Sequence, residues 1–182
     1  SERYGQTQIS VAASRATVLD EPAEAVKPVE DEFPTDAAAR EALEGMLLQP
    51  TGDLTVADNY STNTFGEVVL ATGKGVLRQP TDVARPGSDE AKAIEKENLA
   101  REVVLDDGAT VDYLKDDTDV PLPYLSPDAP VRVGAAATFT SPVVLGFDFK
   151  KWRFQPTTRL TGDNAEAVQP ATFSDTRQAT PG

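Results

Sequence analysis

The chain has 182 residues, with 17 Lys and Arg against 30 Asp and Glu, a formal net charge of −13. This length suits one domain with extensions, and so acidic a surface repels phosphate, which argues against nucleic-acid binding by the surface as a whole. Cysteine and histidine are absent from the sequence, which excludes disulfides, thiolate or His-activated nucleophiles, and zinc sites built on Cys or His.

The N-terminal part is expected to be extended and exposed. Residues 1–18 include the segment GQTQISV, whose alternation and β-branched residues predict a strand, so the chain is expected to be a piece of a larger protein. These first residues lack the pattern of a signal peptide. Residues 19–42 are rich in Pro, Glu, Asp and Ala and predict an acidic linker. Within this linker, Thr35 is expected to cap a short helix over residues 36–41.

Residues 43–160 predict a mainly β fold, a small OB-like β-barrel with one or two short helices, because short apolar segments alternate with turn sequences. The expected strands are Gly45–Leu48, Leu54–Tyr60, Phe65–Ala71, Glu102–Leu105, Val131–Phe139 and Phe147–Gln155. Between the third and fourth strands, Ser88 is expected to cap a helix over residues 89–101. Residues 161–182 are polar and predict a linker toward a further C-terminal domain.

The last predicted strand has the clearest β pattern. After a turn expected at Leu145-Gly146, strict alternation places Trp152 and Phe154 on one face, which we expect to point into the core. The opposite face would carry Phe147, Phe149, Lys151 and Arg153.

A candidate nucleic-acid site lies along and after this strand, where cations alternate with aromatic side chains. Its members are Lys150, Lys151, Trp152, Arg153 and Arg159. Proteins that bind single strands use this combination, because bases stack on aromatic rings at about 1–3 kcal/mol per base. The favoured alternative in so acidic a chain is a barrel strand with its aromatic residues in the core and its cations in solvent.

A candidate metal site lies in the acidic loop after the fourth predicted strand. Its carboxylates are Asp106, Asp107, Asp112, Asp116, Asp117 and Asp119. Calcium takes about six to eight oxygen ligands, which such a loop could supply. The loop lacks the EF-hand spacing, so a solvated acidic loop is the favoured interpretation. The Gly73-Lys74-Gly75 segment likewise lacks the spacing of a phosphate-binding loop and predicts a hairpin turn.

Seven segments of the chain carry a family resemblance in their order. They are EALEGMLL, NTFGEVVLA, LRQPTDVARPGS, EKENLAREVVLDDG, PLPYL, VRVGAAAT and FKKWRFQPT. Together they resemble the region upstream of the catalytic domain in large secreted bacterial nucleases of the endonuclease/exonuclease/phosphatase superfamily. The opening RYGQTQIS resembles the last strand of the OB-like domain that precedes this region. The tail resembles the linker into the nuclease domain. The family pattern would have a Gly- and Tyr-rich turn where this chain has residues 146–152.

The resemblance implies an extracellular, metal-dependent phosphodiesterase as the parent protein, with Mg²⁺ or Ca²⁺ in its catalytic domain. The catalytic positions would lie beyond Gly182, so this chain is expected to hold no catalytic residue and no cofactor. We expect a secreted, monomeric accessory module that does not bind membranes. It would position the covalently linked nuclease domain or weakly assist in binding single-stranded nucleic acid. The alternative is a structural spacer or surface interaction module that binds no nucleic acid.

Overall fold

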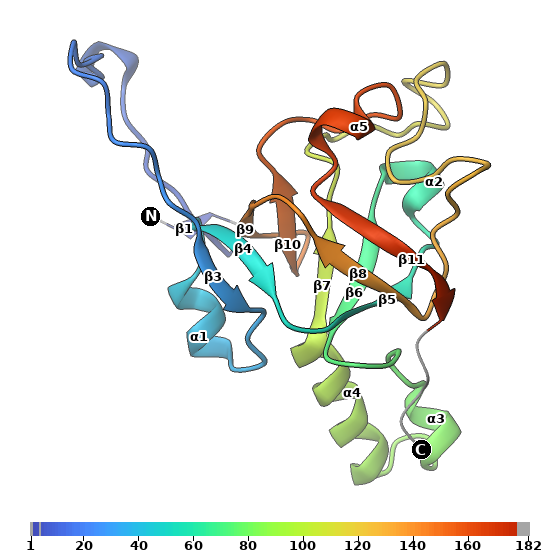
Figure 1. Ribbon diagram of the computed structural model, residues 1–182. Coiled ribbons are helices and arrows are strands. Elements are labelled where there is room, and N and C mark those ends of the chain that lie inside the picture. The colour runs from blue at the N-terminus through green and yellow to red at the C-terminus, as the bar shows by residue number, and fades with distance from the viewer. Residues whose placement is uncertain (1, 4, 178–182) are drawn as a thin grey trace.

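The computed structural model describes residues 2–3 and 5–177, and one large curled sheet lies at its centre (Figure 1). The strands of this sheet are β3 (Val29–Glu32), β4 (Leu47–Thr51), β5 (Leu54–Asp58), β6 (Val68–Thr72), β7 (Glu102–Leu105), β8 (Ala135–Phe139), β9 (Val143–Asp148), β10 (Lys151–Pro156) and β11 (Ala171–Arg177). A separate two-stranded hairpin, β1 (Glu2–Arg3) and β2 (Gln6–Thr7), precedes it. The prediction of a mainly β fold is confirmed.

Short helices connect these strands. They are the 3₁₀ turn η1 (Ala13–Arg15) and the α-helices α1 (Ala37–Ala42), α2 (Thr62–Phe65), α3 (Pro80–Val83), α4 (Asp89–Arg101) and α5 (Ala165–Val168). Within the part of the chain that the structure describes, none has the length and apolar character that crossing a bilayer requires.

The sheet has the order β11-β8-β5-β6-β7-β10-β9-β4-β3 and curls into a half-barrel. Neighbouring strands run antiparallel, except that β7 pairs with β10 and β3 with β4 in parallel. Across the opening of the curl, Gln49 Nε2 on β4 donates a hydrogen bond to the carbonyl oxygen of Phe139 on β8, at 3.2 Å. A side chain thus joins β4 to β8, while β3 and β11 extend beyond them as the two edge strands.

The core fills the inside of the curl. Phe154 is fully buried and makes edge-to-face contacts with Phe33 and Phe139, at ring-centroid distances of 5.6 and 5.2 Å. Such edge-to-face pairs add stabilisation beyond the area they bury. Aliphatic side chains from many strands complete the core, including Leu48, Leu54, Val56, Val68, Leu70, Val103, Leu105, Val143 and Leu145. The predicted inward orientation of Phe154 agrees with this packing, whereas Trp152 is only half-buried beside it.

Helix α4 has the bounds that its sequence predicts. The Ser88 hydroxyl oxygen accepts a hydrogen bond from the Ala91 amide at 3.2 Å, and Asp89 and Glu90 occupy the first turn, where the helix dipole favours carboxylates. The helix leads directly into β7. Helix α1 differs by one residue, because its cap is Asp36, which accepts from the Ala39 amide at 2.9 Å, and not Thr35.

The predicted strand Phe147–Gln155 is wrong, because a hairpin turn interrupts it. Asp148 ends β9 and pairs with Lys151 at the start of β10, so Phe149 and Lys150 form a two-residue loop. Both have positive φ, 49° and 64°, as a type I′ turn requires. The turn predicted at Leu145-Gly146 lies instead inside β9.

Three further predicted strands begin later than expected, and the first of them starts at Leu47 instead of Gly45. The third begins at Val68, because residues 62–65 form α2, and that helix ends at Gly66 with a left-handed φ of 67°. The fifth begins at Ala135, directly after Gly134, whose φ is 90°. Backbone in this conformation suits glycine and interrupts a strand ladder.

The segments predicted as linkers contribute both edge strands. Residues 29–32 form β3, which pairs with β4, and residues 171–177 form β11, which pairs with β8. Ala171 is fully buried, and the Phe173 ring lies edge-on to Tyr124 at 6.0 Å. Their polar composition fits edge strands that expose one side to solvent. Whether the chain divides into the predicted domains stays a prediction.

Residues 9–28, called the arm below, project from the body (Figure 1), and all of them are exposed. The arm begins after β2, where the Thr7 amide donates to Glu44 Oε1 at 3.1 Å, and it ends where β3 enters the sheet. Both ends are therefore fixed to the body.

Candidate functional site

The candidate cations and aromatic residues lie on the β9–β10 hairpin and the loop after it, but their environments differ. Lys150 is exposed in the turn, beside Phe149, which is 73% exposed. Trp152 is half-buried, and its ring lies 5.3 Å from that of Phe147. These residues do not form one continuous row of solvent-facing groups.

The other cations pair with carboxylates. Lys151 Nζ lies 2.6 Å from Glu102 Oε1, and Arg159 Nη2 donates to Asp117 Oδ2 at 2.8 Å. Arg153 is 4% exposed and belongs to the interior. The structure thus brings Lys150 and Lys151 together at one hairpin and holds Arg153 and Arg159 in separate ion pairs.

Arg153 is the centre of a buried ionic cluster. Its Nη1 donates to Glu67 Oε1 and to Asp106 Oδ2, each at 2.6 Å. Its Nε donates to the backbone carbonyl of Asp148 at 3.3 Å, and its guanidinium lies 5.3 Å from the centre of the Phe149 ring. Burial lowers the Arg153 pKa, but the two carboxylates outweigh it, so the pKa lies above its ordinary value.

Asp106 and Asp107 directly follow β7 and fix the loops around its end. Asp106 Oδ1 accepts from the Gly108 amide at 2.8 Å, and its carbonyl oxygen accepts from the Tyr124 hydroxyl at 2.7 Å. Asp107 accepts from the Tyr113 hydroxyl and from the Ala109 amide. Burial raises the pKa of Asp107 above its usual value, although these hydrogen bonds oppose the shift.

Asp107 approaches the backbone of Gly66 so closely that only glycine fits at this position. A Cβ atom at Gly66 would lie 2.6 Å from Asp107 Oδ2, so a side chain there would displace the carboxylate. Gly66 therefore permits both the end of α2 and the packing of that end against Asp107.

The remaining carboxylates of the predicted metal site point elsewhere. Asp116 and Asp119 are exposed, Asp117 pairs with Arg159, and Asp112 accepts from the Lys115 ammonium group at 2.5 Å. Among residues 2–3 and 5–177, no group of three or more carboxylates has a geometry that would hold a metal ion. A metal site in this loop stays a prediction.

The sequence analysis did not single out Glu67, although it is the partner that balances Arg153. Its signal is an acidic residue within the apolar segment GEVVLA, next to buried Val68. A carboxylate at such a position needs a cation or several donors, because an unpaired charge is costly to bury.

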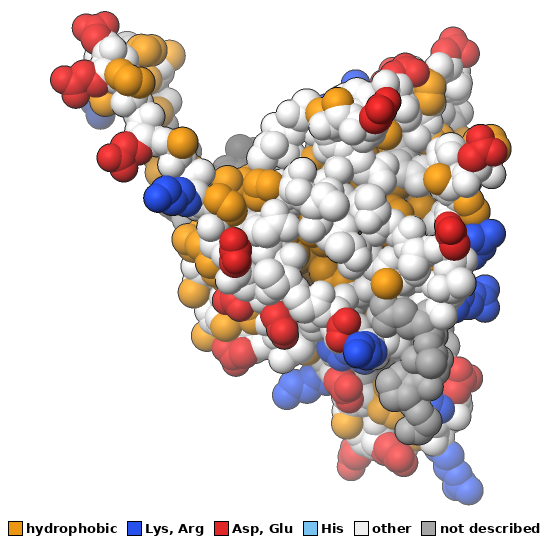
Figure 2. Space-filling model, viewed as in Figure 1, with side chains coloured by type: hydrophobic (Ala, Val, Ile, Leu, Met, Phe, Trp, Pro, Cys, Tyr) orange, Lys and Arg blue, Asp and Glu red, His pale blue; other side chains and the backbone are white. Residues whose placement is uncertain are grey.

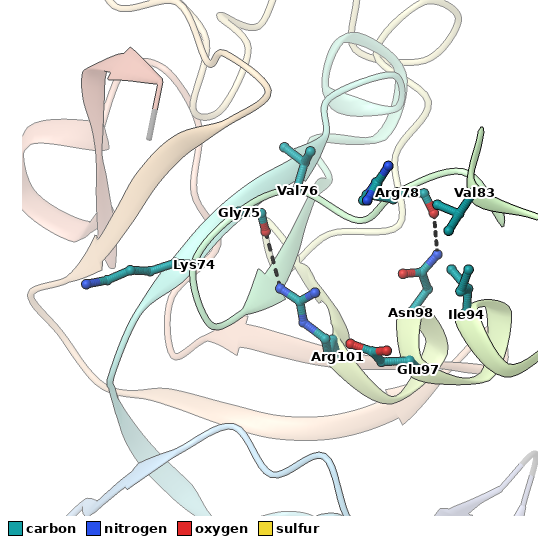
Figure 3. Close-up of a pocket in the computed structure, with 9 residues that line it drawn as sticks. All are labelled: Lys74, Gly75, Val76, Arg78, Val83, Ile94, Glu97, Asn98 and Arg101. Carbon is teal, nitrogen blue, oxygen red and sulfur yellow. Dashed lines mark hydrogen bonds between the residues drawn. The ribbon is translucent and has the colours of Figure 1, made fainter. Parts of the chain in front are cut away.

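A groove between the loop after β6 and the helices α3 and α4 was also missed (Figure 3). It has a volume of about 270 Å³ and is lined by Lys74, Gly75, Val76, Arg78, Val83, Ile94, Glu97, Asn98 and Arg101. Arg101 donates to the carbonyl oxygens of Thr72 and Gly75, and Asn98 Nδ2 donates to that of Arg78 at 2.8 Å. These bonds fix the loop against the helix.

Comparisons with known proteins gave no relative for this chain. No family model, no curated protein and no solved structure matches it.

Proposed function

We propose that this chain is a non-catalytic accessory module of a secreted, metal-dependent nuclease, and that it positions the nuclease domain to which it would be covalently linked. The resemblance of seven ordered segments to the region upstream of such catalytic domains motivates the proposal. In the parent protein, Mg²⁺ or Ca²⁺ would belong to the nuclease domain.

The observation that carries the proposal is the place of the two edge strands. β3, the first strand of the sheet in sequence, and β11, the last, lie at its opposite edges. Each is hydrogen-bonded to its neighbour along the ladder, β3 to β4 and β11 to β8. A domain linked after β11 would therefore follow a strand with a fixed position in the sheet, and β3 joins the arm, whose other end is held at Thr7. This arrangement suits a module that sets the orientation of neighbouring domains.

An OB-like barrel is part of the same proposal. Its support is the order of three sheet strands, β4 to β6, then helix α4, then further strands, in a sheet that curls until Gln49 bridges β4 and β8. That succession is the one expected of an OB-type barrel.

A positioning role has more support than substrate binding. Lys151, Arg153 and Arg159 are held by carboxylates of the same chain. A cation already paired in this way must lose its partner before it can neutralise a phosphate, and the −13 charge repels a polyanion at long range.

Weak binding of single-stranded nucleic acid is a second candidate, favoured by the exposed Phe149 next to the exposed Lys150. An aromatic ring beside a cation can stack a base and contact its phosphate. A fluorescence titration with a single-stranded oligonucleotide would then show binding at low salt that disappears at moderate salt and in Lys150→Glu. Lys115→Glu, an exposed charge reversal in another loop, is the matched control.

The principal test uses the natural full-length protein that contains this sequence. We expect it to include a nuclease domain that hydrolyses DNA with Mg²⁺ or Ca²⁺, and we expect the purified 182-residue chain to hydrolyse none. Deleting residues 29–177 from the full-length protein should impair its activity or the stability of its nuclease domain. A full-length protein without nuclease activity contradicts the proposal. Hydrolysis by the chain alone that disappears in Asp106→Asn would also contradict it.

A further inference from the structure

The groove beside α4 has a charge opposite to that of the molecule as a whole. Three of its lining residues, Lys74, Arg78 and Arg101, are cationic, against the single lining carboxylate of Glu97. Lys74 Nζ also lies 3.6 Å from Oδ2 of Asp53, which does not line the groove, in an exposed ion pair. Within the described part of the chain, the Arg78 guanidinium is exposed and has neither an ion-pair nor a hydrogen-bond partner. In a chain of net charge −13, this is a local site for an acidic ligand.

The same groove is apolar between its cations. Val76, Val83 and Ile94 line it together with the glycine backbone at position 75, and in Figure 3 these side chains come from the loop after β6, from α3 and from α4, respectively. The groove therefore suits an extended peptide that carries both aliphatic and acidic side chains.

The arm is an extended segment that carries both aliphatic and acidic side chains. Its residues 18–26 read VLDEPAEAV, with three carboxylates and no cation. Val18, Leu19 and Val26 are 94%, 77% and 75% exposed, so most of each side chain faces solvent. Figure 2 shows the acidic and apolar side chains gathered on the projecting arm. A cluster of exposed aliphatic residues on a segment held at both ends marks an interaction surface.

We propose that the arm of one copy docks into the groove of a second copy of this chain, with Val18 and Leu19 against the apolar floor and Asp20 and Glu21 toward Arg78. The arm and the α3–α4 region lie at opposite ends of the molecule (Figure 1), and the fixed ends of the arm keep it from its own groove. The contact is therefore heterologous, and repeated contacts close a ring or extend a chain.

A second cavity is a poorer partner for the arm. It lies between the loop at residues 122–130 and β11 and has a volume of about 400 Å³. Its lining residues include Leu125, Phe173 and Asp175. It has no cation, and Asp175 repels an acidic peptide.

Sedimentation velocity of the complete 182-residue chain, over a wide range of concentrations, tests the proposal. We expect association that increases with concentration and weakens as salt is raised. Reversing the arm charges by Asp20→Lys with Glu21→Lys should weaken association about tenfold or more, and so should Lys74→Glu with Arg78→Glu in the groove. All four side chains are exposed, and thermal melting followed by circular dichroism checks that the variants remain folded.

Mixing the two charge-reversed proteins gives the decisive measurement. In each variant alone, the arm and the groove have charges of the same sign. In the mixture, the arm of either variant meets a groove of opposite charge on the other, so the mixture should associate again. Leu125→Asp in the other cavity is the matched control and should leave association unchanged. A wild-type chain that stays monomeric at every concentration overturns the proposal, as does a mixture that fails to associate. The proposal is also overturned if the wild type stays monomeric and binds an oligonucleotide, and if Lys74→Glu with Arg78→Glu abolishes that binding. This result would assign the groove to a polyanion.

Discussion

At the scale of single residues, the buried Arg153 connects parts of the chain that are far apart in sequence. Its guanidinium contacts Glu67 and Asp106, which are 86 and 47 residues away. Burying an ion pair has a large desolvation cost, so the pair adds little net stability compared with apolar residues of the same shape. Its value here is geometric, because it fixes β10 against the start of β6 and the end of β7.

Removing one member of this cluster should therefore be severe. Arg153→Met leaves the carboxylates of Glu67 and Asp106 without their cation, and we expect a loss of about 3–5 kcal/mol in the free energy of unfolding. Urea denaturation measures it. Lys151→Met is the control, since the Lys151 side chain is 47% exposed and its pair with Glu102 should contribute less than about 1 kcal/mol. Equal effects of the two substitutions would contradict a buried structural role for Arg153.

Tyr113 gives a prediction about alkaline pH. Burial, and then the hydrogen bond to the Asp107 carboxylate, raise its pKa from 10.0 to about 12. An unfolded chain releases this proton near pH 10, so the folded state binds more protons between the two values. Its contribution to stability is fully present below pH 10 and is lost as the pH rises through about 12.

We expect Tyr113→Phe to be less stable than the wild type at neutral pH, by about 1–3 kcal/mol, because Asp107 loses a donor. The difference should shrink as the pH rises from 10 to about 12, because the variant lacks this titration. Urea denaturation at a series of pH values measures it. Tyr60→Phe is the control, since Tyr60 is 85% exposed. A stability difference that stays constant over the alkaline range would refute the linkage.

At the scale of elements, local sequence signals predicted α4 and β7 well and the last hairpin poorly. Ser88, with the acidic first turn after it, marks the start of the helix through contacts within a few residues. The β9–β10 turn lacks Asn or Gly at its two positions, so nothing local distinguishes it from a continued strand. Edge strands β3 and β11 were not predicted for a related reason, because most of their residues are not buried on either face, which leaves little apolar alternation in their sequence.

The hairpin turn therefore carries backbone strain that a substitution can relieve. Lys150 has a φ of 64°, which disfavours residues with a Cβ atom. Lys150→Gly should stabilise the protein by about 0.5–1 kcal/mol, measured by chemical denaturation. Lys150→Ala removes the same charge and keeps the strain, so we expect no comparable gain from it. If alanine stabilises as much as glycine, charge and not backbone conformation explains the effect.

At the scale of the whole molecule, one sheet includes strands from residue 29 to residue 177. The sequence indicated a mainly β fold because the interior strands are apolar, but strand order depends on contacts between distant segments. Prediction of the candidate site from the sequence is limited for the same reason. The cations and carboxylates were recognisable as residue types, whereas the choice of which pairs form, such as Arg153 with Glu67, depends on the folded arrangement.

The last strand of this sheet provides a test of its contribution to the whole fold. Ala171 is fully buried on β11, and Thr172 next to it is exposed on the opposite face. Ala171→Glu places a charge in the core and should lower the free energy of unfolding by about 3–5 kcal/mol. Thr172→Glu should change it by less than about 0.5 kcal/mol. Urea denaturation followed by Trp152 fluorescence reports the effect from β10, away from the substitution, because a cooperative fold unfolds as one unit. If both variants match the wild type, residues 171–177 behave as the polar linker that their sequence predicts, and β11 adds nothing to the stability of the sheet.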